Sequence, residues 1–163
     1  MFFNRIVRAI QLDPQVYAEV GADKGAVGLA FGMIMVSSVA TGIGGARGYP
    51  QKIPYLAAIA FGGWLLWIVL TYIIGAKLFP APETQSDIGA VLRVAGLASA
   101  PGLIRLLAYL PPFTVIVSFG AILWTFGTTV IAMQQAFRYH NMPRAIAVTL
   151  FGYLIFQWIF FMA

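Results

Sequence analysis

Long apolar segments alternate with short polar ones along most of the chain. Five apolar segments, each of about 20 residues, are separated by loops that contain Gly, Pro and charged residues. A helix of this length crosses the roughly 30 Å hydrocarbon core of a bilayer, because an α-helix rises about 1.5 Å per residue. The pattern therefore predicts an all-α polytopic membrane helix bundle with five transmembrane helices, over residues 26–44, 55–76, 88–110, 113–137 and 145–163.

The first 24 residues show a different pattern, in which apolar and polar positions fall on opposite sides of a helix. The apolar positions are Phe2, Phe3, Ile6, Val7 and Ile10, and the polar ones are Asn4, Arg8 and Gln11. This spacing is typical of an amphipathic helix that lies on a membrane surface. Asp13 and Pro14 suit the N-cap and the first position of a second short helix. We expect residues 1–24 to form amphipathic helices on the cytoplasmic side and residues 25–163 to form the transmembrane domain.

Composition supports a membrane protein. The chain has 163 residues, of which 61% are hydrophobic and 9% are charged, against about 25% charged in ordinary soluble domains. A small soluble core cannot bury that much apolar surface. The absence of cysteine excludes disulfides, thiol chemistry, iron–sulfur clusters and cysteine zinc sites.

The net charge of +5 bears on orientation more than on partners. The basic residues lie between the apolar segments and form no basic run, so we expect contact with lipid headgroups and no nucleic-acid partner. With a cytoplasmic N-terminus, six basic residues lie inside and two outside; the inside set is Arg5, Arg8, Lys24, Lys77, Arg138 and Arg144, and the outside set is Arg47 and Lys52. The positive-inside rule predicts an integral membrane protein with its N-terminus cytoplasmic and its C-terminus outside.

The third apolar segment carries two charges and a helix breaker in "RVAGLASAPGLIR". Arg93 and Arg105 either anchor the two ends of a short helix or face a polar site inside the bundle. Pro101 removes one backbone hydrogen bond and crowds the carbonyl of Leu97, so a kinked helix and two half-helices both stay open. The candidate polar or hinge site comprises Arg93, Ser99, Pro101, Arg105 and Gln134.

Depth in the membrane gives Arg93 its expected partners. Gln134 and Gln135 end the fourth segment at the same depth, and the acidic residues on that side are Glu19, Asp23, Glu83 and Asp87. A cluster of Arg93 with Glu19 or Asp23 would hold the N-terminal helices against the bundle.

Small residues recur four positions apart, which lets helix backbones approach closely. The pairs are Gly28–Gly32, Ala40–Gly44, Ala58–Gly62 and Ala98–Gly102. We take Gly28, Gly32, Ala98 and Gly102 as candidate helix-packing positions, either within this bundle or at a seam between two copies.

Catalytic patterns are missing from the sequence. His140 is the single histidine, and it lies in a loop without another ligand at metal-binding spacing. No acidic residue falls inside an apolar segment, which argues against a proton-driven transporter. We therefore expect no enzyme activity, no metal and no cofactor.

Several stretches resemble the Yip1 family of small five-span membrane proteins. They are "DIGAVLRVAGLASAPGLI", the preceding "GGWLLWIVLTYIIGAKLF", the fourth segment with Trp124, "MPRAIAVTLF" and the N-terminal "LDPQVYAEV". The resemblance implies five helices, a cytoplasmic N-terminus and no enzyme activity. Eukaryotic relatives act in ER–Golgi vesicle traffic and associate with Rab GTPases and with each other. This chain lacks their "DLYGP" element and resembles bacterial members, so Rab binding does not follow. The resemblance to bacterial members implies a place in the bacterial inner (plasma) membrane.

Three functional hypotheses remain. The first is a non-enzymatic protein of Yip1 type that binds other membrane proteins or itself, or organises and shapes the bilayer. The second is a small transporter or channel-like subunit, in which the third segment and its arginines line a path for an anion or a lipid headgroup. The third is an accessory subunit of a larger membrane complex. The sequence names no small-molecule ligand.

Overall fold

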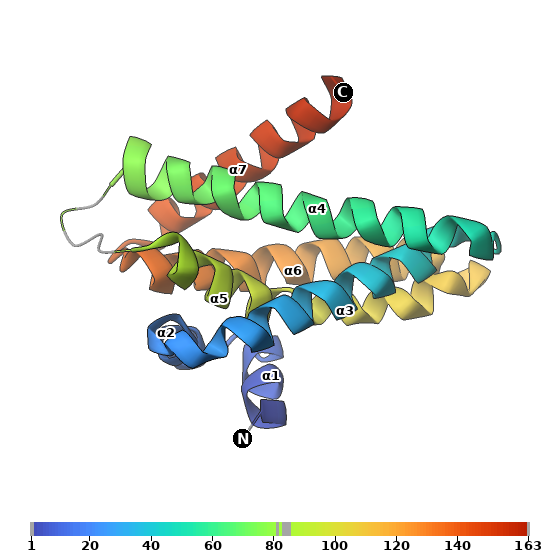
Figure 1. Cartoon of the computed structure of the whole chain (residues 1–163), viewed down its shortest axis with the longest axis horizontal. Coiled ribbons are helices and arrows are strands. Elements are labelled where there is room, and N and C mark those ends of the chain that lie inside the picture. Colours follow the sequence, from blue (N-terminus) through green and yellow to red (C-terminus); the bar gives the residue numbers. More distant parts are fainter. Residues whose placement is uncertain (1, 81, 83–85, 163) are drawn as a thin grey trace.

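The fold is a bundle of helices, seen in a computed structural model that describes residues 2–80, 82 and 86–162 (Figure 1). Every regular element in these residues is helical, which confirms the all-α prediction. The α-helices are α1 (Phe2–Ile10), α2 (Pro14–Ala22), α3 (Val27–Ala46), α4 (Ile53–Tyr72), α5 (Ile88–Ala98), α6 (Thr114–Phe137) and α7 (Met142–Met162). Shorter elements are the 3₁₀ turns η1 (Lys24–Ala26), η2 (Pro50–Lys52) and η5 (Pro111–Phe113), the π-helical η3 (Ile73–Leu78) and the 3₁₀ helix η4 (Ala100–Tyr109).

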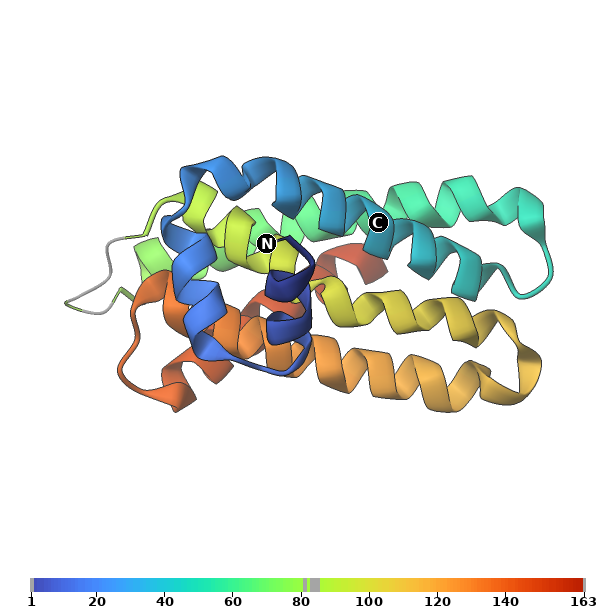
Figure 2. The same cartoon turned by 90° about the horizontal axis from the view of Figure 1, so that it is seen from below.

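Four helical stretches are long and apolar enough to cross a membrane, and they match the first four predicted segments. They cover Lys24–Ala46, Pro50–Leu78, Ile88–Tyr109 and Pro111–Phe137. The four lie side by side along the long axis of the molecule (Figures 1 and 2). The fifth predicted segment falls on α7, which leaves the bundle on a slant; its last residue, Ala163, lies outside the described residues.

Local sequence signals set several helix ends. The Asp13 side chain accepts a hydrogen bond from the backbone N–H of Gln15 and Pro14 follows it, which confirms the predicted start of α2. Asp87 caps α5 in the same way, 2.7 Å from the N–H of Ala90. Arg47 and Arg138 adopt left-handed backbone angles directly after α3 and α6, the conformation that commonly ends a helix.

The third membrane-length segment consists of two helices of different type. α5 ends at Ala98, and η4 continues the segment as a 3₁₀ helix of 10 residues, longer than the three or four residues usual for this geometry. Pro101 occupies the first turn of η4, where its missing N–H removes no helical hydrogen bond. The third segment is therefore helical throughout, with an α-helical part before Ser99 and a 3₁₀ part after it.

Close backbone contacts hold this third segment against α3. A Cβ added to Gly96 would lie 2.5 Å from the Cα of Ala30, and one added to Gly102 would overlap the Ser37 hydroxyl. Farther along, a Cβ on Gly44 would overlap the carbonyl of Arg105. The contacts advance together along both segments, which therefore run parallel with almost no space between their backbones.

The predicted packing positions divide into two groups. Ala98 and Gly102 are buried in the bundle, and Gly102 lies at the contact with α3. Gly28 and Gly32 are exposed on α3, and a Cβ added to either meets nothing within 4 Å. Packing within this chain therefore does not use the Gly28–Gly32 pair, because that face of α3 points away from its neighbours.

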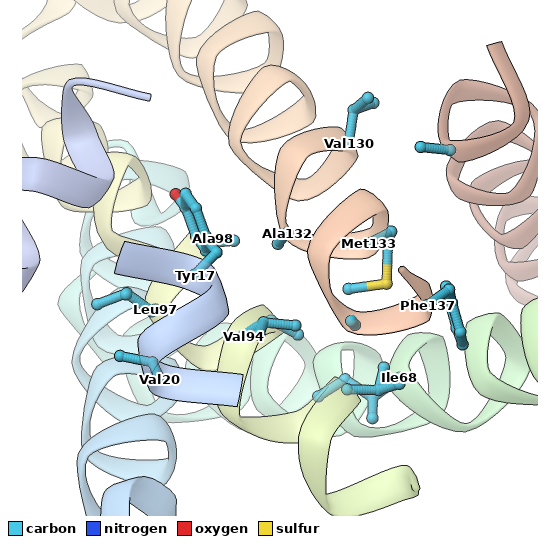
Figure 3. Close-up of a cluster of buried hydrophobic side chains, with 14 of the residues drawn as sticks. Tyr17, Val20, Ile68, Val94, Leu97, Ala98, Val130, Ala132, Met133 and Phe137 are labelled. Atoms are coloured by element: carbon cyan, nitrogen blue, oxygen red, sulfur yellow. The ribbon is translucent and has the colours of Figure 1, made fainter. Parts of the chain in front are cut away.

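The main core lies in the half of the bundle where α2 covers α5 and α6 (Figure 3). The buried side chains of this core include Tyr17 and Val20 of α2, Ile68 of α4, Val94, Leu97 and Ala98 of α5, and Val130, Met133 and Phe137 of α6. The N-terminal helices are therefore part of the folded bundle.

The α1–α2 hairpin lies along the flank of the bundle, with α1 crosswise to the long axis (Figures 1 and 2). The Trp124 indole N–H donates to the carbonyl of Ile10 at 2.9 Å. Trp124 lies about 20 Å along α6 from its end at Phe137. Ile6 and Ile10 of α1 pack against a second buried cluster, formed by Leu29, Met33 and Ala100.

Candidate functional site

Arg93 fastens the N-terminal hairpin to the bundle. Its side chain is 6% exposed, and Nη2 and Nε donate to the carbonyl oxygen of Gly21 at 2.6 and 3.2 Å. Gly21 lies in the last turn of α2, where backbone carbonyls lack helical partners and carry partial negative charge. Arg93 therefore acts as a cationic cap for α2, a structural role that accounts for one of the two arginines in this segment.

Two of the acidic residues expected to meet Arg93, Glu19 and Asp23, are paired elsewhere. Glu83 lies outside the described residues, and Asp87 caps α5. Asp23 binds Arg5 at 2.9 Å, and Arg8 binds Asp13 at 2.7 Å and Glu19 at 3.1 Å. The expected cluster of Arg93 with Glu19 or Asp23 thus gives way to ion pairs inside the hairpin. The expected link between hairpin and bundle is present, but a backbone carbonyl makes it.

These ion pairs shift the titration of the hairpin. The hydrogen bond from Arg5 lowers the pKa of the Asp23 carboxyl, with help from the Gly25 N–H. The hydrogen bond from Arg8 likewise lowers the pKa of Asp13. Both carboxylates therefore stay ionised near neutral pH and hold α1 against α2.

A hydroxyl of α6 lies within hydrogen-bond distance of the last backbone carbonyl of α5. Thr128 Oγ1 lies 2.9 Å from the carbonyl oxygens of both Ala98 and Thr125, and the Ser99 hydroxyl donates to Gly96 at 2.7 Å. Both side chains are buried. A neighbouring helix thus supplies the hydrogen bond that the change from α to 3₁₀ geometry leaves unmade, as backbone within a membrane requires.

Gln134 forms no hydrogen bond with Arg93 in the part of the chain that the structure describes. Its carbonyl accepts the N–H of Tyr139 at 3.0 Å as α6 ends. The buried Tyr139 hydroxyl donates to the carbonyl of Gly75, inside η3, at 3.0 Å. Burial raises the pKa of this phenol. The backbone of Gln134 therefore takes part in ending α6.

Arg105 occupies a different setting from Arg93. Its side chain points back along η4 toward Gly102. A Cβ added to Gly102 would lie 3.1 Å from Arg105 Nη1. Side chains on helices generally point toward the N-terminus in this way. Arg105 lines a cavity of about 730 Å³ whose wall also includes residues of α3, α4, α6 and α7. Within the described residues, no hydrogen bond or salt bridge reaches its guanidinium.

Two hydroxyls that line the same cavity also lack partners among the described residues. Thr125 of α6 is 9% exposed and Thr149 of α7 is 1% exposed, and neither Oγ1 makes a hydrogen bond. A buried polar atom without a partner is costly, so such atoms in one cavity mark a place where a polar ligand atom binds favourably. No group of three or more His, Asp or Glu side chains gathers as a metal site in the described chain.

Sequence reasoning found the two arginines but missed these hydroxyls. Thr125, Thr128 and Thr129 lie close together in an otherwise apolar segment, and this polar run was the available signal. The carbonyl of Gly21 gives no comparable signal, since every residue has a carbonyl.

Comparison of the chain with family models, with curated proteins and with solved structures gives no significant match. The class of protein therefore follows from the fold. Four apolar helices of membrane length place the chain among helical integral membrane proteins.

Proposed function

We propose that this chain is a non-enzymatic integral membrane protein of Yip1 type that organises or shapes the bilayer and associates with other membrane proteins. In this proposal α7 is the fifth span, the N-terminus is cytoplasmic and the C-terminus is outside. The sequence pattern supports the family assignment, and the distribution of Lys and Arg supports the orientation. The length of α7, 21 residues, supports a fifth crossing.

The crosswise placement of α1 carries the functional proposal. α1 is amphipathic and its Phe3 is 77% exposed, while Arg5 and Arg8 on its polar side bind carboxylates of the hairpin. An amphipathic helix held against the flank of a membrane-spanning bundle displaces lipid on that flank. Two hydrogen-bonded contacts fix the α1–α2 hairpin to the bundle: Arg93 donates to the Gly21 carbonyl of α2, and Trp124 donates to the Ile10 carbonyl at the end of α1. The bundle thereby turns a mobile surface helix into a fixed wedge.

Reconstitution tests the wedge directly. Purified protein is inserted into liposomes of defined lipid, and vesicle diameter is measured by electron microscopy at increasing protein density. Wild-type protein should reduce the diameter, and Phe3→Ser should lessen that effect. Phe79→Ser is the matched control, since Phe79 is 57% exposed and lies away from α1. Equal diameters with wild type and Phe3→Ser would contradict the proposal.

Topology is tested separately. Reporter domains that work only on one side of the membrane are fused after Phe79, after Tyr139 and at the C-terminus. The proposed arrangement places the first two inside and the last outside. A cytoplasmic C-terminus would remove the fifth span while leaving the wedge to be judged by the liposome result.

A further inference from the structure

A cavity beside α7 combines an apolar wall with a single charge. Its volume is about 730 Å³, within the roughly 300–1,000 Å³ range of small-molecule sites, and it is partly open. Apolar side chains such as Ile59, Trp64, Ile122 and Phe126 form much of the wall. Residues of the slanted helix α7, such as Leu150 and Tyr153, also contribute to the wall (Figure 1).

Arg105 is the one charged side chain among the described residues that line the cavity. A guanidinium in a membrane interior is costly unless it reaches the interface or finds a partner. Arg105 turns inward toward Gly102, away from the end of its segment at Tyr109, and has no partner in the described chain. The geometry therefore leaves a planar cation with donors available inside an apolar space.

Two further observations point to an occupant with a polar head. Thr125 and Thr149 are at least nine-tenths buried, line the cavity and leave their hydroxyls unpaired in the described residues. A carboxylate accepts hydrogen bonds from both a guanidinium and a hydroxyl, and its charge offsets that of Arg105. An apolar tail is required as well, because a small inorganic anion would leave the aromatic and aliphatic wall uncovered.

We propose that this cavity binds a single-chain amphiphile with an anionic head, of the fatty-acid class. The carboxylate lies against Arg105, and the chain runs along the apolar wall to which α4 and α6 contribute. One acyl chain suits the cavity volume, whereas a two-chain phospholipid would leave its second chain outside.

Quenching of tryptophan fluorescence tests this proposal, because Trp64 and Trp67 line the cavity. Full-length protein in nanodiscs of uncharged lipid is titrated with dibromostearate, whose bromine atoms quench indoles on contact. We expect saturable quenching that the methyl ester of the same acid does not reproduce and that inorganic phosphate does not compete away. Equal binding of acid and ester, or competition by phosphate alone, would overturn the fatty-acid assignment, as would stronger binding of a brominated two-chain anionic phospholipid.

Variants assign the contact to Arg105. Arg105→Gln should weaken binding about tenfold, since it replaces a charge-assisted pair by a neutral one. Arg105→Lys should retain part of the affinity, and Arg47→Gln, on the exposed loop after α3, should retain all of it. Ile59→Trp fills the cavity without changing its charge and should abolish saturable quenching. Unchanged binding in either Arg105→Gln or Ile59→Trp would place the ligand elsewhere and refute the proposal. The melting temperature of each variant in nanodiscs shows whether the variant is folded.

Discussion

The Thr128 hydroxyl lies 2.9 Å from the carbonyl oxygen of Ala98, at the point where α5 gives way to η4. α6 thus supplies a hydrogen bond where the third segment changes helical type. The junction depends on this contact because water is not available there to replace it.

Removing that hydroxyl should destabilise the bundle. We expect Thr128→Val, which keeps the shape of the side chain, to lower the free energy of unfolding by about 0.6–1.7 kcal/mol, the range for buried hydrogen bonds between membrane helices. Thr41→Val is the control, since the Thr41 hydroxyl donates only within its own helix, to Ser37. Unfolding followed by circular dichroism in mild detergent measures both. If both variants lose the same free energy of unfolding, the contact between Thr128 and Ala98 adds no stability beyond that of a hydrogen bond within one helix.

The close contact between α3 and α5 should make Gly96 intolerant of substitution. Gly96→Ala places a methyl group 2.5 Å from the Cα of Ala30, and backbone cannot move aside easily. We expect a loss of about 1–3 kcal/mol, as for other overpacked sites. Gly28→Ala meets nothing within 4 Å and should keep or slightly raise stability. Thermal melting of the purified variants distinguishes them, and a stable Gly96→Ala protein would mean that the two helices are farther apart.

Loss of Arg93 should release the hairpin while the membrane-length helices stay folded. Arg93→Gln removes the cationic cap on the Gly21 carbonyl, so we expect the amides of α2 to exchange hydrogen faster with little change in α6. Hydrogen exchange with mass spectrometry on full-length protein reports both regions. Arg105→Gln serves as the comparison, because its side chain does not contact the hairpin. Uniformly faster exchange would instead indicate global destabilisation.

Acid should loosen the same hairpin. The pKa values of Asp13 and Asp23 lie below their ordinary value of 3.8, because Arg8 and Arg5 donate hydrogen bonds to the ionised carboxylates. Their stabilising contribution is complete above the ordinary pKa and is lost as pH falls through the lowered values. The hairpin should therefore be insensitive to pH from neutrality to about 4 and loosen in stronger acid. Fluorescence of Trp124, whose indole binds Ile10, follows this change, and Asp23→Asn should reduce its amplitude.

The sequence predicted those features that follow from the types of residue in a segment, such as the position of a helix. Hydropathy located the four membrane-length helices, and Asp13 with Pro14 located the start of α2. Contacts that depend on backbone geometry could not be predicted from the sequence. The partner of Arg93 is a carbonyl that any residue would provide, and the inward turn of Arg105 follows from local helical geometry at Gly102.

The position of the α1–α2 hairpin against the bundle could not be predicted from the sequence for a related reason. Amphipathic spacing shows that one side of α1 avoids water, but lipid and the flank of a bundle satisfy that side equally well. Ile10 and Trp124 are separated by more than a hundred positions in the sequence, and only the folded chain shows that they meet.

The 3₁₀ form of η4 has a mechanical consequence. A 3₁₀ helix rises about 2.0 Å per residue, so the 10 residues of η4 extend about 5 Å farther than the same residues would in α-helical form. Ten residues in this form cover a length for which an α-helix would need about 13 residues. The third segment therefore reaches the Pro111–Pro112 corner with about three residues fewer than a uniform α-helix would use.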